Sequence, residues 1–261
     1  MEVEFIEKDE NKAVLVLKNV PVALVNSIRR AMMSYVPTMA VDYINVYMNT
    51  SYLFDEILAH RIGLIPIKTD VDKFNFPDKC ECGGEGCPRC QVSLRLNAEG
   101  PKTVYSGEFV SDDPETKPVY DNVPVVKLYE GQQLMIEAVA RLGIGKEHAK
   151  WKPVSVCAYK ILPEIRIDEK CNVCRDCVLA CPRQVLEIND GKISVRDPLN
   201  CSMCMECTNV CEENAISVEE TDNYLFTIES VGSMPALEIF RRGVEVLMKK
   251  AEEMNKSLEY I

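Results

Sequence analysis

The sequence predicts a fold that mixes β-strands with a small number of helices and contains a separate cysteine-rich region. Two observations indicate the mixture. Alternating apolar and polar residues recur through the first 165 residues, and a heptad pattern of apolar residues fills the C-terminal end. A third observation marks the cysteine-rich region, where one four-cysteine motif occurs twice within residues 168–218.

The first 40 residues predict a β-hairpin followed by a helix. Val3 and Phe5 alternate with glutamates, and the apolar run 13–17 follows a polar stretch, as in two paired strands. A helix opens at 19–21, where a proline suits the first turn, and ends at Pro37. Helical spacing predicts one apolar face, made of Leu24, Ile28, Ala31, Met32 and Tyr35.

The middle of the chain predicts strands around a loop. Residues 41–52 alternate as strands do, and residues 54–61 predict a short helix that ends near Gly63. Residues 69–90 form a loop region, and residues 91–165 contain further strand-like runs separated by polar turns. We expect a mainly β region with one short helix.

The C-terminal region predicts a long helix with an apolar stripe. Seven apolar residues are separated alternately by three and four positions: Leu237, Phe240, Val244, Leu247, Ala251, Met254 and Leu258. Charged residues lie off this stripe, as they do beside the seam of a coiled coil. Such a helix packs its stripe either on its own core or against a partner helix, and the periodicity favours neither.

The repeated motif has the form C-x2-C-x2-C-x3-C, with the two copies 30 residues apart. This spacing is typical of ferredoxins with two 4Fe–4S clusters, in which each motif gives its fourth cysteine to the other cluster. Zinc motifs instead pair C-x2-C units across a longer gap. One cluster would use Cys171, Cys174, Cys177 and Cys211. The other would use Cys201, Cys204, Cys207 and Cys181. Between the copies, Asp190-Gly191 predicts a hairpin.

A second group of four cysteines lies in a glycine-rich loop. Four thiolates this close suit a tetrahedral structural zinc site, with no open position for a catalytic water. The alternative is a set of reduced or partly disulfide-bonded loop thiols. The group consists of Cys80, Cys82, Cys87 and Cys90. The thirteenth cysteine, Cys157, stands alone in an apolar run, and we expect a small buried hydrophobic side chain there.

The charge of the chain argues against direct DNA binding. With 30 basic and 41 acidic residues, the net charge is −11, whereas binding to phosphates requires a basic surface. The pairs Arg29–Arg30 and Arg241–Arg242 allow a local basic patch, but solvated helix faces are the simpler interpretation.

The sequence also predicts neither a membrane protein nor an enzyme. There is no run of 18 apolar residues and no signal-peptide pattern, so we expect a cytoplasmic protein. The two histidines, His60 and His148, lie near no nucleophile motif, and no phosphate-binding glycine pattern occurs. We therefore expect no catalytic residues of its own.

Three segments resemble the α-like subunits of RNA polymerases, the archaeal D subunits among them. These are residues 19–32, 36–42 and, as the most specific match, the segment from Asn49 to Ile67. The resemblance implies an α+β fold in which a discontinuous dimerisation domain holds two insertions. The dimerisation domain would comprise residues 1–40 and 220–261. The first insertion, at 41–165, would be a mainly β domain that carries the zinc loop. The second, at 166–219, would be a ferredoxin-like Fe–S domain.

The resemblance also implies a function. The chain would be a non-catalytic assembly subunit of DNA-directed RNA polymerase that heterodimerises with the small L subunit. With the N and P subunits it would form the platform for the large catalytic subunits, and its clusters would be structural or regulatory. An alternative is an electron-transferring ferredoxin-domain subunit of an oxidoreductase, although no flavin or nicotinamide motif occurs. A redox sensor inside the polymerase is a third possibility.

Overall fold

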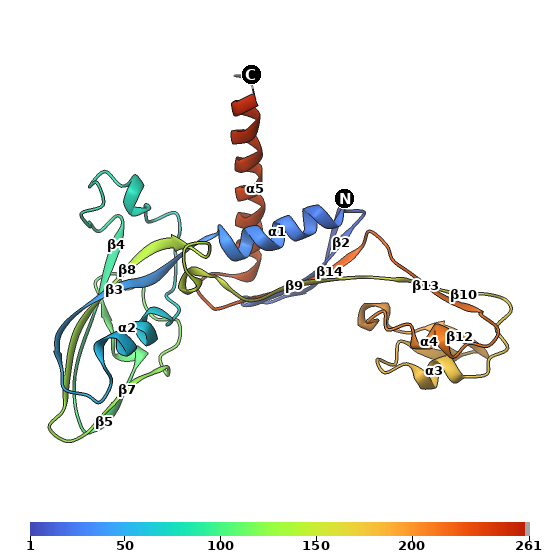
Figure 1. Cartoon of the computed structure of the whole chain (residues 1–261), viewed down its shortest axis with the longest axis horizontal. Helices are drawn as coiled ribbons and strands as arrows, with labels where there is room; N and C mark the ends of the chain where they lie inside the picture. Colours follow the sequence, from blue (N-terminus) through green and yellow to red (C-terminus); the bar gives the residue numbers. More distant parts are fainter. Residues whose placement is uncertain (259–261) are drawn as a thin grey trace. The chain divides into compact units, whose positions relative to one another are not determined.

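The computed structural model describes residues 1–258, and the chain divides into two compact units. The first unit is made of three segments: 1–7, 14–26 and 158–227. The second is made of three others: 8–13, 27–157 and the chain from Ile228 onward. Figure 1 shows the elements of both units coloured along the chain.

The second unit is built on an antiparallel sheet with the strand order β3–β8–β4–β6, of which Figure 1 labels the first three. The strands are β3 (Pro37–Asn49), β8 (Gln133–Ile144), β4 (Gln91–Glu99) and β6 (Val110–Ser111). β3 and β8 pair over almost their full lengths, with two register shifts in β3. A smaller sheet and one helix complete this part: β5 (Lys102–Tyr105), β7 (Pro124–Leu128) and α2 (Asp55–Gly63). The predicted short helix is therefore confirmed.

The core of this unit follows from the alternation on β4. Its inward side chains Val92, Leu94 and Leu96 are buried, whereas the intervening residues are partly or fully exposed. α2 contributes Leu58 and Ile62 to the same core. One continuous apolar core therefore joins the helix to the sheet.

A further sheet has the order β1–β2–β14–β9, and the first unit contains the larger share of it together with the cysteine-rich region. The strands of that sheet are β1 (Glu2–Lys8), β2 (Lys12–Lys18), β14 (Tyr224–Ser230) and β9 (Val154–Ile161). The cysteine-rich region holds two antiparallel strand pairs: β10 (Glu164–Ile167) with β13 (Ile216–Glu219), and β11 (Leu186–Asn189) with β12 (Lys192–Val195). Two short helices carry cysteines, α3 (Asp176–Ala180) and α4 (Glu206–Asn209).

The predicted hairpin between the two motifs is confirmed. β11 and β12 are joined by Asp190 at φ 49° and Gly191 at φ 74°, both in the left-handed region that a type I′ turn requires. The turn thus sets the register of this pair, in which Ile188 lies opposite Ile193.

The first helix, α1 (Val22–Ser34), forms as expected but buries a slightly different face. Ile28, Ala31 and Met32 are buried, as the spacing predicts. The inclusion of Leu24 was wrong, because Leu24 is exposed and Val25 is fully buried in its place. Val25 and Met32 are seven residues apart, two helical turns, and so share one side of the helix.

The long C-terminal helix, α5 (Ala236–Leu258), is also confirmed. Its buried residues are Ala236, Ile239 and Gly243, all in its first two turns. Gly243 is required there, since a Cβ atom would lie 2.6 Å from Cγ of Met32. From residue 248 onward every described residue of α5 is exposed, including Leu258.

The arginine pair on α5 is neutralised by carboxylates rather than free to form a basic patch. Arg241 bonds to Glu238 and Glu245 on its own helix. Arg242 bonds to Glu238 and, at 2.7 Å, to Asp72. The simpler interpretation of this pair, a solvated helix face, therefore agrees with its contacts.

None of the helices within residues 1–258 combines the length and the apolar character that a membrane span requires.

Leu94→Ala is predicted to lower the unfolding free energy of the second unit by about 2–5 kcal/mol, because it leaves a cavity in the shared core. Leu94 is 1% exposed, whereas Val110, on the neighbouring strand, is 70% exposed. Val110→Ala is the control and should change stability by no more than about 0.5 kcal/mol. Urea denaturation followed by fluorescence of Trp151, the single tryptophan, measures both. Equal midpoints for the two variants would contradict the assigned core.

Candidate metal centres

The four cysteines of the glycine-rich loop converge on one point. The sulfurs of Cys80, Cys82, Cys87 and Cys90 all lie within 4.8 Å of one another. Three separations are 3.5 Å for Cys80–Cys87, 3.6 Å for Cys82–Cys90 and 3.8 Å for Cys87–Cys90. A tetrahedron of sulfurs around zinc, with bonds of about 2.3 Å, has edges of about 3.8 Å. The four side chains therefore fit a zinc ion and form no disulfide.

Two tight turns bring these cysteines together. The backbone N–H of Gly83 donates to the carbonyl of Cys80 at 2.9 Å, and that of Cys90 donates to the carbonyl of Cys87 at 2.9 Å. Gly83 and Gly86 both have positive φ, 64° and 98°, which side-chain-bearing residues adopt at a cost. The glycines of the loop thus allow the chain to fold around a single ion.

The environment gives the four thiols different acidities. The backbone N–H of Gly86, the thiol of Cys80 and the backbone N–H of Gly84 donate to the sulfur of Cys82 and lower its pKa to about 6. Burial raises the pKa of Cys90 to about 12. A bound cation would have to stabilise the thiolate of Cys90, whereas Cys82 is a thiolate at neutral pH without one.

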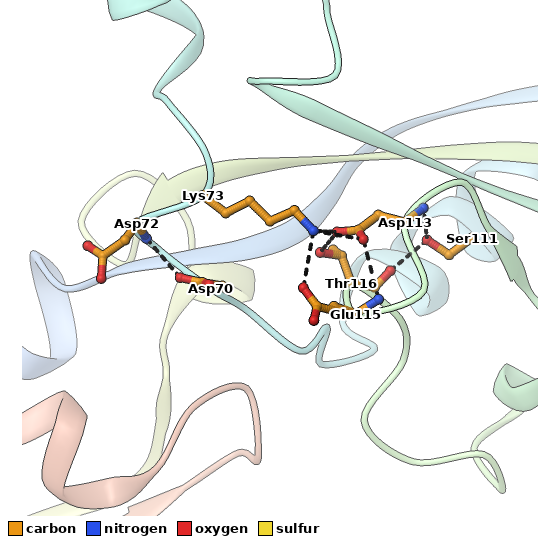
Figure 2. Close-up of polar contacts among 7 residues, drawn as sticks. All are labelled: Asp70, Asp72, Lys73, Ser111, Asp113, Glu115 and Thr116. Atoms are coloured by element: carbon orange, nitrogen blue, oxygen red, sulfur yellow. Dashed lines mark hydrogen bonds and ion pairs between the residues drawn. The ribbon is translucent and has the colours of Figure 1, made fainter.

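The segment that leads into this loop contains Lys73, whose ammonium group binds two carboxylates (Figure 2). Nζ of Lys73 lies 2.8 Å from both carboxylate oxygens of Asp113 and 3.2 Å from Glu115. Asp113 also accepts a hydrogen bond from the hydroxyl of Thr116 at 2.7 Å. Further along, the N–H of Asn75 donates to the carbonyl of Arg89 at 2.8 Å and closes the base of the loop. The cysteine loop is thus fixed at its base.

The eight cysteines of the repeat surround two separate hollows. Each hollow is lined by three cysteines of one motif and the fourth cysteine of the other. The first is lined by Cys171, Cys174, Cys177 and Cys211. The second is lined by Cys181, Cys201, Cys204 and Cys207. Both hollows also have apolar walls, to which β10, β11, β12 and β13 contribute. A four-iron cube needs such a space between its ligands, unlike a single ion.

The backbone around the hollows is strained in a repeated way. Val173 and Met203, which occupy the same position in the two motifs, have φ of 59° and 55°. Arg175 and Met205 form a second such pair, at 76° and 64°. Left-handed φ is unfavourable for residues with a side chain, above all for a β-branched one such as Val173. Strain at equivalent positions in both motifs is consistent with bound groups that compensate for it.

Hydrogen bonds and burial also repeat between the motifs. The N–H of Val185 donates to the sulfur of Cys181 at 3.4 Å, and the N–H of Ala215 donates to that of Cys211 at 3.2 Å. Burial, and then the neighbouring cysteines, raise the pKa of Cys177, and burial is also the main cause of the raised pKa of Cys207. A bound cation would stabilise the thiolates of these residues and so oppose the shift, which fits an iron site.

A residue outside the motifs, missed by the sequence analysis, contacts one of the cysteines that line the second hollow. Nζ of Lys160, on β9, donates to the carbonyl oxygen of Cys201 at 3.2 Å. Forty-one residues separate the two in sequence, so no local spacing signals this contact. Arg183, which follows the Cys181-Pro182 pair, lines the same hollow. Its place directly after the motif is a signal that sequence analysis could have used.

The remaining candidate residues lie away from these centres. His60 is exposed on α2, and Nδ1 of His148 accepts a hydrogen bond from the backbone N–H of Lys150 at 3.1 Å, which caps a short turn. Cys157 is half-buried rather than fully buried, and its sulfur lies 3.8 Å from the carbonyl of Arg29. Burial raises its pKa to about 12 and makes this thiol unreactive.

Comparison with known proteins gives two family matches and several full-length relatives. The RNA polymerase Rpb3/RpoA insert domain matches residues 44–161, and the 4Fe-4S dicluster domain matches residues 170–216. The chain is 57% identical to the DNA-directed RNA polymerase subunit Rpo3 of Archaeoglobus fulgidus, over 100% of this chain and 98% of the relative. The corresponding subunit of Methanosarcina acetivorans is 44% identical, over 100% and 99%. That of Pyrococcus furiosus is 38% identical, over 99% and 97%.

In metal-free protein, Cys82 is predicted to react with iodoacetamide fastest of the four loop cysteines at pH 7. With a pKa of about 6 it is mostly thiolate there, and its rate should rise from pH 5 to pH 7 and then level off. Cys90, with a pKa of about 12, should react slowly, and its rate should still be rising at pH 9. Mass spectrometry of the alkylated peptides measures both rates. Equal rates at pH 7 would contradict the assigned hydrogen bonds to Cys82.

Proposed function

We propose that this chain, which belongs to the archaeal Rpo3 family of DNA-directed RNA polymerase subunits, works as a non-catalytic assembly subunit of that polymerase. Relatives of this family match it from end to end, including the part outside the cysteine repeat. The observation that carries the proposal is the exposed second half of α5, which continues an apolar stripe beyond the chain's own core.

The partner proposed for α5 is the small L subunit. The chain's own core takes up Ala236, Ile239 and Gly243, which lie beside the stripe rather than on it. On the stripe itself, Met254 is 65% exposed and Leu258 is 54% exposed. Apolar residues at heptad spacing on an exposed helix favour packing against a second helix. Helix pairing of this kind would explain why the heptad pattern extends beyond the core.

The wider assembly is proposed from the family. The N and P subunits join the pair formed with L, and this group carries the two large catalytic subunits in the cytoplasm. We propose a dimerisation domain at 1–40 and 220–261, with a zinc-bearing domain at 41–165 and the Fe–S domain at 166–219. The two family matches fall inside the two inserted segments, which supports these boundaries. The net charge of −11 gives no support to a separate DNA-binding role.

The metal sites are proposed as two 4Fe–4S clusters and one zinc ion. The two hollows support the crossed ligand sets, and the sulfur tetrahedron of the glycine-rich loop supports zinc. A bound cluster joins four thiolates and exchanges one electron. The chain's own residues hold the thiolates, donate N–H groups to them and shield them with apolar side chains. The oxidoreductase alternative is weaker, since residues 44–161 match a polymerase domain.

Leu247→Asp is predicted to weaken binding to L more than a hundredfold, because an unpaired buried charge costs about 3–5 kcal/mol. Leu247 lies in the middle of the stripe. Met248→Asp makes a like change one residue away, off the stripe and 59% exposed, and should retain L. A pull-down with tagged L compares the two, and circular dichroism checks that α5 still folds.

The cluster region should not be needed for this contact. Cys171→Ser combined with Cys201→Ser removes one proposed ligand from each cluster and should loosen residues 166–219 while L binding persists. Loss of L from this variant, together with retention of L by Leu247→Asp, would assign dimer formation to the clusters instead of the helix.

Protein reconstituted without oxygen is predicted to hold about eight iron atoms, four in each cluster. Cys211→Ala lies in the second motif but should remove the cluster of the first motif, and leave about four iron atoms. Its electron paramagnetic resonance spectrum should therefore match that of Cys174→Ala and differ from that of Cys204→Ala. A match to Cys204→Ala would show that the ligand sets are not crossed.

A further inference from the structure

The two hollows are related by the sequence repeat, but their charged surroundings differ. The first is lined by three carboxylates, those of Asp176, Glu212 and Glu213, and by one guanidinium, that of Arg175. The second has no carboxylate among its lining residues within the described chain, and its one charged lining residue is Arg183. The first hollow is therefore the more negative of the two.

Lys160 adds to this difference. Its ammonium group comes from β9 and donates to the carbonyl oxygen of Cys201, one of the four cysteines of the second hollow, at 3.2 Å, although Lys160 does not itself line the hollow. Lys160 is half-buried, so solvent screens its charge less than that of a fully exposed lysine. Because Lys160 lies outside the repeat, the repeat supplies no counterpart for the first hollow.

The surroundings of Lys160 act on its charge in both directions. Burial is the main cause of a lowered pKa of Lys160 and the guanidinium of Arg183 adds to it, whereas the negative charges at Cys201 and Asp197 oppose the lowering. A bound cluster, which is anionic with its four thiolates, would add to that opposition. Asp197 also accepts a hydrogen bond from Asn200 at 2.6 Å.

Hydrogen bonds to the cysteine sulfurs do not favour reduction of the first site over the second. The bonds from Val185 to Cys181 and from Ala215 to Cys211 occupy equivalent positions and so act on both sites. A further N–H, that of Met203, lies 3.5 Å from the sulfur of Cys201 and favours the reduced state of the second site.

We propose that Lys160, with Arg183, gives the cluster at Cys181, Cys201, Cys204 and Cys207 the higher reduction potential, so that the first electron resides there. The inference rests on the two-cluster assignment proposed above. Reduction adds one electron, from a low-potential one-electron donor such as dithionite, to a [4Fe–4S]2+ cluster and gives [4Fe–4S]+. No bond breaks and no proton moves. The added negative charge is stabilised by nearby positive charge and opposed by carboxylates.

The second cluster is therefore the first to be reduced when the surroundings become more reducing. The first reduction changes the charge next to Lys160, on the strand β9 that leads into the cysteine-rich region. The first hollow, surrounded by carboxylates, holds its cluster oxidised until a stronger reductant is present. The two clusters thus respond to different reducing conditions.

The test is a redox titration of the full-length, reconstituted protein with dithionite at pH 7, followed by electron paramagnetic resonance. Lys160→Gln should reduce the ratio of reduced to oxidised second cluster about tenfold at a fixed potential, a shift of about 59 mV for a one-electron couple. The first cluster should not shift. Lys160→Arg keeps the charge and should keep the wild-type potential.

Lys18→Gln is the matched control. It removes one lysine charge from the same unit, where Lys18 pairs with Glu4 at 2.7 Å, and should shift neither cluster. Cys211→Ala identifies the signals, because only the second cluster, with the higher potential, should remain in it.

Three results of the titration would overturn the proposal, and a fourth comes from the iron content. They are no shift in Lys160→Gln, an equal shift of both clusters, or survival of only the lower-potential signal in Cys211→Ala. Loss of the second cluster from Lys160→Gln would also overturn it, since Lys160 would then hold the cluster and not tune it. Iron analysis before each titration separates these results from failure of the two-cluster assignment, which would show as about four iron atoms or fewer in the wild type.

Discussion

The region from Glu164 to Glu219 depends on its eight cysteines, whose sulfurs surround two hollows. The apolar core of this region is too small to stabilise it alone. Only seven of its residues are buried: Cys177, Val185, Leu186, Ile193, Ala215, Ile216 and Val218. Its strand pairs have four residues on each side, and its helices are one turn long. A region this small does not bury enough apolar surface to be stable alone, and metal clusters commonly supply the remainder. Its left-handed residues and raised thiol pKa values are further costs that bound iron would offset.

The rest of the chain is stabilised mainly by apolar packing and ion pairs. The sheet of β3, β8, β4 and β6 shares one apolar core with α2, and the four sulfurs that fit a zinc ion lie in the glycine-rich loop of the same unit. The helix α5 is fixed at its base by Gly243 against Met32 and by Arg242 on Asp72. Its second half is exposed. A sheet with its own apolar core, cysteine groups that fit metal ions and a helix with an exposed second half together suit a protein whose task is assembly.

The sequence predicted what depends on short spacing. The cysteine motifs, the Asp190-Gly191 turn and the heptad stripe of α5 all involve residues a few positions apart, where local geometry decides the outcome. Contacts between distant residues left no such signal. Lys160 meets Cys201 across 41 residues, and the buried face of α5 is set by where Met32 lies. The left-handed backbone at Val173 was equally hidden, since a valine in that conformation is supported only by what surrounds it.

The central claim is that the chain is an assembly subunit of RNA polymerase and not a carrier of electrons for a metabolic enzyme. The most direct measurement is capture of the tagged full-length chain from archaeal cells, without oxygen, with identification of the proteins retained in equal amounts. We expect the L, N and P subunits together with the large catalytic subunits. A flavin- or nicotinamide-dependent enzyme retained in equal amounts, with no polymerase subunit present, would contradict it.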